Sequence, residues 1–286
     1  MGLKLCVLAS GSSGNCTYIA SDTTHLLIDA GLSGKKTIGL LQQVDGNADN
    51  LNAICLTHEH SDHRSGLGVL QRKFGLQLFG NAGTIEAVEM DKKLNGLDWN
   101  VFSVGASFTI GDLEIEPFSV PHDSYDPVGF IICLDEIRVG VITDMGIATS
   151  AIRERLKGCS ALVVESNHDE GMLRDSARPW QLKQRIAGRQ GHLSNSQAGE
   201  LVVDVAGTEL KTVFLAHLSS DCNTPDLAYK NMRSVLDKNN LGHIDVQMTF
   251  ADKASLILEI KCRLSSSISF IRFFTVDFVY CFALCL

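Results

Sequence analysis

The sequence lacks the excess of positive charge found in proteins that coat nucleic acid by bulk electrostatics. Its 33 acidic residues outnumber its 25 lysines and arginines, so the formal net charge is -8 at pH 7. Proline is also scarce, with 5 residues in 286. No proline-rich boundary, low-complexity linker or internal repeat divides the chain, which predicts one domain. Local basic patches are still compatible with this charge.

The nine cysteines include no Cys-x-x-Cys pair and lie mostly inside apolar runs. Cys6, Cys55 and Cys133 are typical of small buried side chains in a reducing compartment, not of a disulfide framework. The first residues, MGLKLCVLASGSSGN, contain one lysine and no long apolar segment, so we expect no signal peptide. These features predict a cytoplasmic protein.

Short β-rich runs alternate with helical patterns along the chain. Helices are expected at 35–44, 64–74 and 82–93, and further helical patterns follow residue 147. The clearest strands are expected at 3–9, 16–20, 25–30, 53–57, 107–110, 113–119, 128–134, 137–143, 161–166, 212–217, 245–250 and 255–260. Hairpins in both halves, with helices outside them, predict an α+β fold: an αββα four-layer sandwich over residues 1–261.

Residues 262–286, CRLSSSISFIRFFTVDFVYCFALCL, form an atypical apolar tail. A membrane-spanning helix needs about 20 apolar residues. Arg272 and Asp277 interrupt the stretch, and each is costly at the centre of a bilayer. We therefore expect a poorly packed extension outside the fold, with a membrane anchor or an aberrant end of the reading frame as alternatives.

The stretch LTHEHSDHRSGL, residues 56–67, crowds potential metal ligands directly after an apolar strand. Alternate residues of an extended segment point the same way, so His58 and His60 can coordinate one ion together. Asp62 and His63 can then turn toward a second position. Imidazole and carboxylate groups are good ligands for zinc and similar ions. Four such residues in six positions favour a metal site over a solvated polar loop.

Three more ligand-type residues follow apolar strands farther along the chain. His122 lies in SVPHDSYDPVGF, Asp144 in GVITDMG and His217 in FLAHLS. Each of them alone would be more typical of a structural residue. Since all three follow strands, we expect them to gather at one end of the sheets.

The ordered set His-x-His-x-Asp-His, then His, Asp and His, resembles the metallo-β-lactamase superfamily over residues 1 to about 260. The strings ASGSSGNCTYI, DAGLSGKK, THEHSDH, PHDSYDPVGF, VVESNHDEGML and GHLSN are similar to its WalJ (YycJ)-type branch, bacterial proteins regarded as 5′→3′ DNA exonucleases. The resemblance implies a DNA substrate and two divalent metal ions, zinc or manganese, that share a hydroxide as nucleophile.

The resemblance also implies the ligand sets. The first metal site maps to His58, His60 and His122, the second maps to Asp62, His63 and His217, and Asp144 bridges them. Asp62 can in addition orient the proton of the attacking hydroxide. The implied reaction is hydrolysis of a phosphodiester, with a small-molecule thioester or lactone hydrolase and a non-catalytic metal-binding regulatory module as alternatives. The sequence predicts no particular oligomeric state.

Other residues are candidates for catalysis or substrate contacts. His192 in RQGHLSN is the candidate that donates a proton or a hydrogen bond to the leaving oxygen; the alternative is a structural role beside a helix. His168 in ESNHDE can contact phosphate or solvate a turn. In the loop ASGSSGN, residues 9–15, the candidates for holding a phosphate are Ser12, Ser13 and Asn15. The alternative is that this loop is only a tight turn. No Gly-Lys-Ser/Thr follows it, which excludes a Walker loop.

A nucleic-acid substrate needs cations near the site, and the segment 174–189 is rich in lysine and arginine directly before His192. Most clusters of this kind are solvated helix faces. Trp180 lies in the same segment. It can stack on a base or anchor its helix to the core, and we expect the core.

Overall fold

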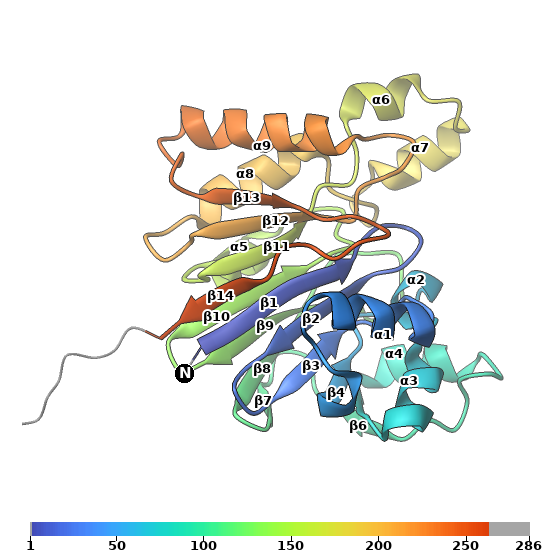
Figure 1. The fold of residues 1–286 in the computed structure, drawn as a ribbon. Coiled ribbons are helices and arrows are strands. Elements are labelled where there is room, and N and C mark those ends of the chain that lie inside the picture. Colours follow the sequence, from blue (N-terminus) through green and yellow to red (C-terminus); the bar gives the residue numbers. More distant parts are fainter. Residues whose placement is uncertain (1, 263–286) are drawn as a thin grey trace, which may run out of the picture.

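The computed structural model describes residues 2–262, in which two seven-stranded sheets pack face to face with helices outside each (Figure 1). One sheet has the order β14-β1-β2-β3-β4-β5-β6 and the other β13-β12-β11-β10-β9-β8-β7. The strands are β1 (Gly2–Ala9), β2 (Cys16–Ala20), β3 (His25–Ile28), β4 (Ala53–Cys55), β5 (Gln77–Gly80), β6 (Trp99–Val101), β7 (Phe108–Ile110), β8 (Leu113–Ser119), β9 (Val128–Leu134), β10 (Ile137–Ile142), β11 (Ala161–Glu165), β12 (Thr212–Ala216), β13 (Asp245–Met248) and β14 (Leu258–Lys261).

The helices cover the outer faces of the two sheets (Figure 1). They are α1 (Gly34–Gln43), α2 (Ser61–Arg64), α3 (Leu67–Phe74), α4 (Ala82–Glu89), α5 (Ser150–Leu156), α6 (Glu170–Asp175), α7 (Trp180–Ile186), α8 (Asn195–Val205) and α9 (Pro225–Lys238), with a short 3-10 turn at Ala48–Asn50. No helix in the described part of the chain is long and apolar enough to cross a membrane.

Both sheets are mixed in the same way. Strands β3, β4, β5 and β6 pair in parallel, as do β10, β11, β12 and β13, and the other neighbours are antiparallel. Because parallel strands end at the same edge of a sheet, the residues that follow β4, β10, β11 and β12 are delivered to one end of the molecule. Functional side chains concentrate there.

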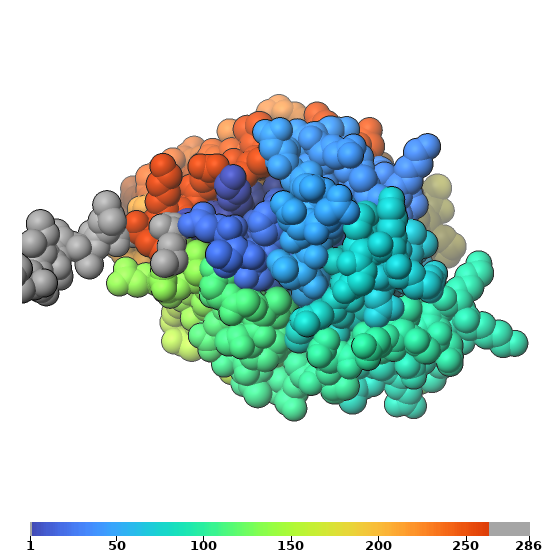
Figure 2. All heavy atoms as spheres, turned by 60° about the horizontal axis from the view of Figure 1, so that its bottom comes forward, coloured from blue at the N-terminus to red at the C-terminus, as the bar shows by residue number. Residues whose placement is uncertain are grey.

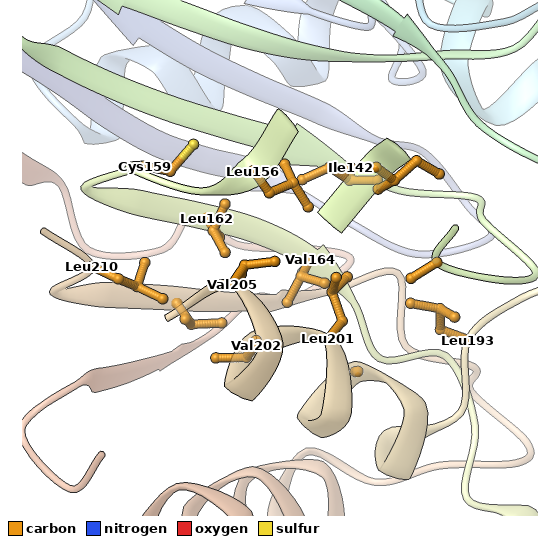
Figure 3. Packing of buried hydrophobic residues seen from close by; sticks show 14 of the residues in the cluster. Ile142, Leu156, Cys159, Leu162, Val164, Leu193, Leu201, Val202, Val205 and Leu210 are labelled. Carbon is orange, nitrogen blue, oxygen red and sulfur yellow. The ribbon is translucent and has the colours of Figure 1, made fainter. Parts of the chain in front are cut away.

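Three apolar clusters hold the layers together. One joins the inner faces of the two sheets and includes Phe130 and Phe214, which have no exposed surface. A second packs α1 and α3 on the first sheet. A third packs α5, α8 and α9 on the second, with Leu201 of α8 beside Val164 of β11 (Figure 3). The predicted αββα four-layer sandwich is therefore confirmed.

The helix predicted at 64–74 is wrong in its beginning, because the chain breaks into α2 and α3 around Gly66. The amide of Gly66 donates to the carbonyl of Ala30 at 2.7 Å. A Cβ at Gly66 would lie 2.1 Å from the carbonyl oxygen of Leu32. The short edge strand β6 was not predicted either.

Strand β14 pairs with β1, which brings the last described residues beside the first (Figures 1 and 2). In Figure 2 the orange and red segment lies against the blue N-terminal segment. The expectation of an unpacked tail at 262–286 concerns residues that, apart from Cys262, lie outside the described part of the chain.

Candidate metal centre

The predicted ligand residues all follow buried strands and meet between the two sheets. His58 and His60 follow β4, and Asp62 and His63 lie in α2. The remaining three come from the second sheet, after β8, β10 and β12: His122, Asp144 and His217. The local fold thus delivers seven ligand-type side chains from four loops to one place.

His58, His60 and His122 form the first group of converging donors. Nε2 of His58 lies 3.1 Å from Nδ1 of His60, and Nε2 of His122 lies 3.3 Å from the same atom. His60 carries at most one proton on Nδ1, so it cannot donate to both neighbours. The other ring nitrogen of His122 lies 3.1 Å from the carbonyl of Gly191, which leaves Nε2 free to face the group.

Asp62, His63 and His217 form the second group. Oδ2 of Asp62 lies 3.5 Å from Nε2 of His63 and 3.4 Å from Nε2 of His217. Asp144 lies between the two groups. Its Oδ2 is 2.9 Å from Nε2 of His63, and its Oδ1 is 3.8 Å from Nε2 of His122.

A buried carboxylate, Asp29, orients the imidazoles of the first loop. It accepts from Nδ1 of His63 at 2.7 Å, and from the amide and hydroxyl of Thr57 at 2.8 and 2.9–3.0 Å. The Thr57 hydroxyl in turn lies 2.9 Å from Nδ1 of His58. With their Nδ1 atoms engaged, both rings present Nε2 to the centre, which is the usual outer support of metal-ligating histidines.

Glu165, the last residue of β11, has the same role on the other side and was not predicted as a site residue. Its Oε1 accepts from Nδ1 of His192 at 2.7 Å and from Nδ1 of His217 at 3.0 Å. Its Oε2 accepts from the amides of Met145 and Leu193, both at 3.0 Å. The sequence did hold one signal, because an acid ends a strand whose residues are all buried.

Three of these residues have a backbone conformation that most side chains avoid. Asp29, Asp144 and His217 have φ of 63°, 55° and 55°. Aspartate and histidine are among the residues that tolerate this left-handed region best, and such strain is concentrated at functional sites. Each turn bends the chain sharply just beyond a buried strand, so the side chain enters the centre instead of continuing along the sheet.

Three loops interlock beneath Asp62. The amide of Asn15 donates to the carbonyl of Asp62 at 2.7 Å, and the amide of Ala30 donates to the carbonyl of His63 at 2.7 Å. A Cβ at Gly31 would lie 1.7 Å from the carbonyl oxygen of Asp62, so only glycine fits there. The backbone that carries the ligands is therefore fixed by its neighbours.

The charges of the centre are strongly coupled. Burial lowers the pKa of His58 well below its ordinary value. Burial also disfavours the charged form of His217, but Asp144, Asp62 and Glu165 outweigh it and raise the pKa of His217 to about 10. In the same way His217 and His63 hold the pKa of the buried Asp144 well below its usual range. Protons on the second group's imidazoles thus offset the surrounding carboxylates.

This donor set fits a divalent cation. Ligand atoms 2.0–2.1 Å from a tetrahedral ion lie about 3.3–3.4 Å from one another, close to the nitrogen separations around His60. Oδ2 of Asp144 is buried and makes no well-formed hydrogen bond, although buried carboxylates normally find partners. The histidine and aspartate clusters therefore suggest divalent metal binding, and they do not identify the metal.

The other predicted site residues lie at different distances from the centre. His192 approaches it closely, since its Nδ1 is 3.5 Å from Oδ1 of Asp144. Asn15 is buried, and its amide nitrogen lies 3.3 Å from Oδ2 of Asp62. Ser12 and Ser13 are exposed in the preceding loop. His168 is buried farther away, where its backbone pairs with residue 194.

Comparison with known proteins agrees with this geometry. A family model described as "Beta-lactamase superfamily domain" matches residues 24–217. An exodeoxyribonuclease YycJ of Bacillus anthracis is 41% identical over 249 residues, which cover 85% of this chain and 92% of the relative. An exodeoxyribonuclease WalJ of Streptococcus pneumoniae is 38% identical over 266 residues, covering 91% and 99%.

Solved structures share the fold at low identity. The metallo-beta-lactamase fold protein YhfI from Bacillus subtilis superposes with a TM-score of 0.69 at 18% identity, covering 91% of this chain and 100% of that one. Zinc-bound PqqB from Methylobacterium extorquens gives 0.66 at 16% identity, with 90% and 99% covered. The sequence resemblance is thereby confirmed: the chain belongs to the beta-lactamase superfamily and, within it, to the family of the YycJ and WalJ relatives.

Proposed function

We propose that this protein is a metal-dependent exodeoxyribonuclease that hydrolyses phosphodiester bonds of DNA from the 5′ end. One observation carries the chemistry: four histidines of the centre hold their Nδ1 atoms in outer hydrogen bonds and turn Nε2 inward, toward the carboxylates of Asp62 and Asp144. The substrate class is supported by the two relatives, whose names describe exodeoxyribonucleases. Such an enzyme acts in the cytoplasm, as the cysteine usage predicts.

The cofactors in this proposal are two divalent ions, zinc or manganese. His58, His60 and His122 would hold one, while Asp62, His63 and His217 would hold the other, and Asp144 would contact both. When bound, such a pair lowers the pKa of water and neutralises charge on a phosphoryl oxygen. The chain's own residues position the reactants and move protons.

Asp62 is the residue that orients the attacking water in this scheme. Its carboxylate is less buried than that of Asp144, with 21% of the side chain exposed against 4%, so it borders the space a substrate enters. Its pKa is held low, because contacts with His217 and His63 outweigh the effect of burial. Asp62 is therefore ionised at neutral pH and accepts a proton or a hydrogen bond from water.

His192 is the donor to the leaving oxygen. Burial alone would lower its pKa, but the Glu165 carboxylate 2.7 Å from Nδ1 outweighs burial and raises it. The ring is partly exposed, which gives it access to the substrate side. A raised pKa favours the cationic ring, which can donate a proton or stabilise developing negative charge.

The rim beside His192 favours a phosphodiester over a thioester or lactone. Two adjoining hollows there share Asp123 and Arg185, and they also expose Arg178 and Arg189. Carboxylates pair with two of these arginines and position them: Asp123 with Arg185, and Asp221 with Arg178. A small apolar substrate would need a closed apolar wall, whereas basic side chains suit a nucleic-acid backbone.

The exposed hydroxyls of Ser12 and Ser13 remain proposed phosphate contacts. They stand on the loop whose Asn15 touches Asp62, so a phosphate held there would lie close to the reacting bond. Asn15 itself would act through Asp62 and His63, because its amide nitrogen is buried against them.

The test is cleavage of end-labelled DNA with a 5′-phosphate or a 5′-hydroxyl, with manganese or zinc loaded. We expect metal-dependent shortening from the 5′ end, a loss of at least about 100-fold in Asp62→Ala, and no change in Asp226→Ala. Asp226 is the matched control because it pairs only with Lys230 on the exposed side of α9. Wild-type protein that binds two metals yet cuts neither DNA nor RNA would overturn the proposal and bring the thioester or lactone reaction forward.

A further inference from the structure

Helix α7, which is labelled in Figure 1, lies between two hollows, because its residues line both of them. One face of the helix, with Leu182 and Arg185, borders the hollow that contains His192. The opposite face, with Trp180 and Lys183, lines a second pocket of about 310 Å³. Residues three and four apart on a helix share a face, which explains this division. The first hollow belongs to the proposed substrate rim beside His192.

The wall of the second pocket is apolar, and its main side chain is Trp180. The structure overturns the expectation that Trp180 anchors the core, since 69% of the residue is exposed. Leu173 of α6 and Ala187 complete the apolar lining. A large aromatic ring left open to water beside a pocket is typical of a binding surface, because Trp otherwise buries its area.

His168 contributes a polar atom to the same wall. The residue is 1% exposed, and its Nδ1 has no hydrogen-bond partner among residues 2–262. Its backbone is fixed, because the amide of Asn195 donates to the carbonyl of His168 at 2.9 Å. Buried polar atoms without partners are rare in folded proteins. A ligand with polar edges would relieve this one.

Cations border the pocket. Lys183 and Arg174 both line it, and Nζ of Lys183 donates to the carbonyl of Arg174 at 2.6 Å. The one carboxylate in the lining, Glu170, accepts from the hydroxyls of Ser194 and Ser196. An aromatic face next to positive side chains is the combination that single-stranded nucleic acids bind, because bases stack while the backbone follows the charge. A purely apolar ligand would gain nothing from these cations.

We propose that this pocket holds one base of the DNA substrate, stacked on Trp180, with Lys183 and Arg174 on the adjoining phosphates. The inference rests on the proposed nuclease function and assigns it a subsite. The pocket lies across α7, a helix about 10–12 Å in diameter, from the hollow that contains His192, so the base belongs to a nucleotide beyond those at the bond that is cut. Stacking tolerates any base, which suits an enzyme that degrades a strand step by step.

The test compares Trp180→Ala, Trp180→Phe and the control Tyr229→Ala, which removes a 40%-exposed aromatic ring from α9. Trp180→Ala should raise KM for single-stranded DNA by about 5- to 100-fold with little change in kcat. Trp180→Phe should have a KM close to that of wild type, and Tyr229→Ala should change neither KM nor kcat. When an abasic residue is moved along the substrate, wild-type activity should fall at one position away from the bond that is cut, and Trp180→Ala should not be affected there.

Binding of a labelled single strand without metal, measured by fluorescence anisotropy, separates the two proposals. If wild type binds DNA and Trp180→Ala loses affinity, the subsite stands even when no cleavage is seen, and only the nuclease function falls. If Trp180→Ala binds and cuts DNA as wild type does, the subsite is overturned and the nuclease function is untouched. An equal cost of the abasic residue in both proteins would also overturn it.

Discussion

Replacing Glu165 by glutamine changes one atom at the junction between the metal centre and His192. The carboxylate accepts four hydrogen bonds, two from imidazoles and two from backbone amides. A glutamine side chain has the same shape but keeps only one accepting oxygen. Its amino group must therefore face either the two amides or the two imidazoles, and each choice has a different measurable cost.

Facing the amides of Met145 and Leu193, the amino group would leave two buried donors without an acceptor. Each costs about 1–3 kcal/mol, so the free energy of unfolding would fall by about 2–6 kcal/mol. Facing His192 and His217, it would require both Nδ1 atoms to accept. The proton of His217 would then sit on Nε2 and block the atom that faces Asp62, which would lower metal affinity by about 10- to 100-fold.

Calorimetric metal titration and thermal unfolding distinguish the two outcomes in one set of samples. Glu116→Gln is the matched control, because Glu116 also accepts from a charged partner, Arg138 at 2.8 Å, but lies away from the centre. It should change stability slightly and metal binding not at all. Wild-type metal affinity together with wild-type stability in Glu165→Gln would refute the assignment of Glu165 as a positioning residue.

Two further predictions concern the proton content and the backbone of the centre. The pKa of His217 is near 10, above its ordinary value of 6.5, so its proton stabilises the metal-free fold fully below about pH 6.5, and that contribution is lost as the pH rises toward 10. Metal binding should also release protons, which makes the heat of binding depend on the buffer. A heat of binding that is independent of the buffer would contradict this. In Gly31→Ala the new Cβ would collide with the Asp62 carbonyl, so the metal should no longer stabilise the protein in thermal unfolding. The control Gly39→Ala, in open space within α1, should raise the free energy of unfolding by about 0.5–1 kcal/mol. Tight metal binding by Gly31→Ala would disprove the packing argument.

The metal centre could be foreseen because its ligands follow strands that are recognisable from their apolar runs. His58, His122, Asp144 and His217 are each adjacent to such a run, and parallel pairing brings the strand ends together. The outer support could not be foreseen in the same way. Glu165 belongs to the predicted strand 161–166, and its partners lie 20 to 52 positions away.

Tertiary contacts also decide the cases in which local patterns predicted the wrong structure. The apolar spacing of 64–74 favours one helix, but the Gly66 amide bonds to Ala30 and the helix is interrupted. Trp180 has the residue type of a core anchor, yet α7 presents it to solvent. For Gly66 the deciding atom belongs to a segment that periodicity within a short window does not compare.

The hydrogen bonds behind the ligands make the two donor groups electrostatically different. In the first group, the Nδ1 atoms of His58 and His122 donate to neutral acceptors, the Thr57 hydroxyl and the Gly191 carbonyl. In the second group, His63 and His217 donate to the carboxylates of Asp29 and Glu165, and Asp62 adds a third negative charge.

A carboxylate behind an imidazole raises the basicity of the ring, and each nearby negative charge favours a cation. The second group therefore attracts positive charge more strongly than the first, whether that charge is a proton or a metal ion. The raised pKa of His63 and His217 and the lowered pKa of His58 and His122 express this same difference. Asp144, placed between the groups, couples an electron-rich position to a neutral one, and such asymmetry suits a reaction in which one side holds the nucleophile and the other receives the substrate.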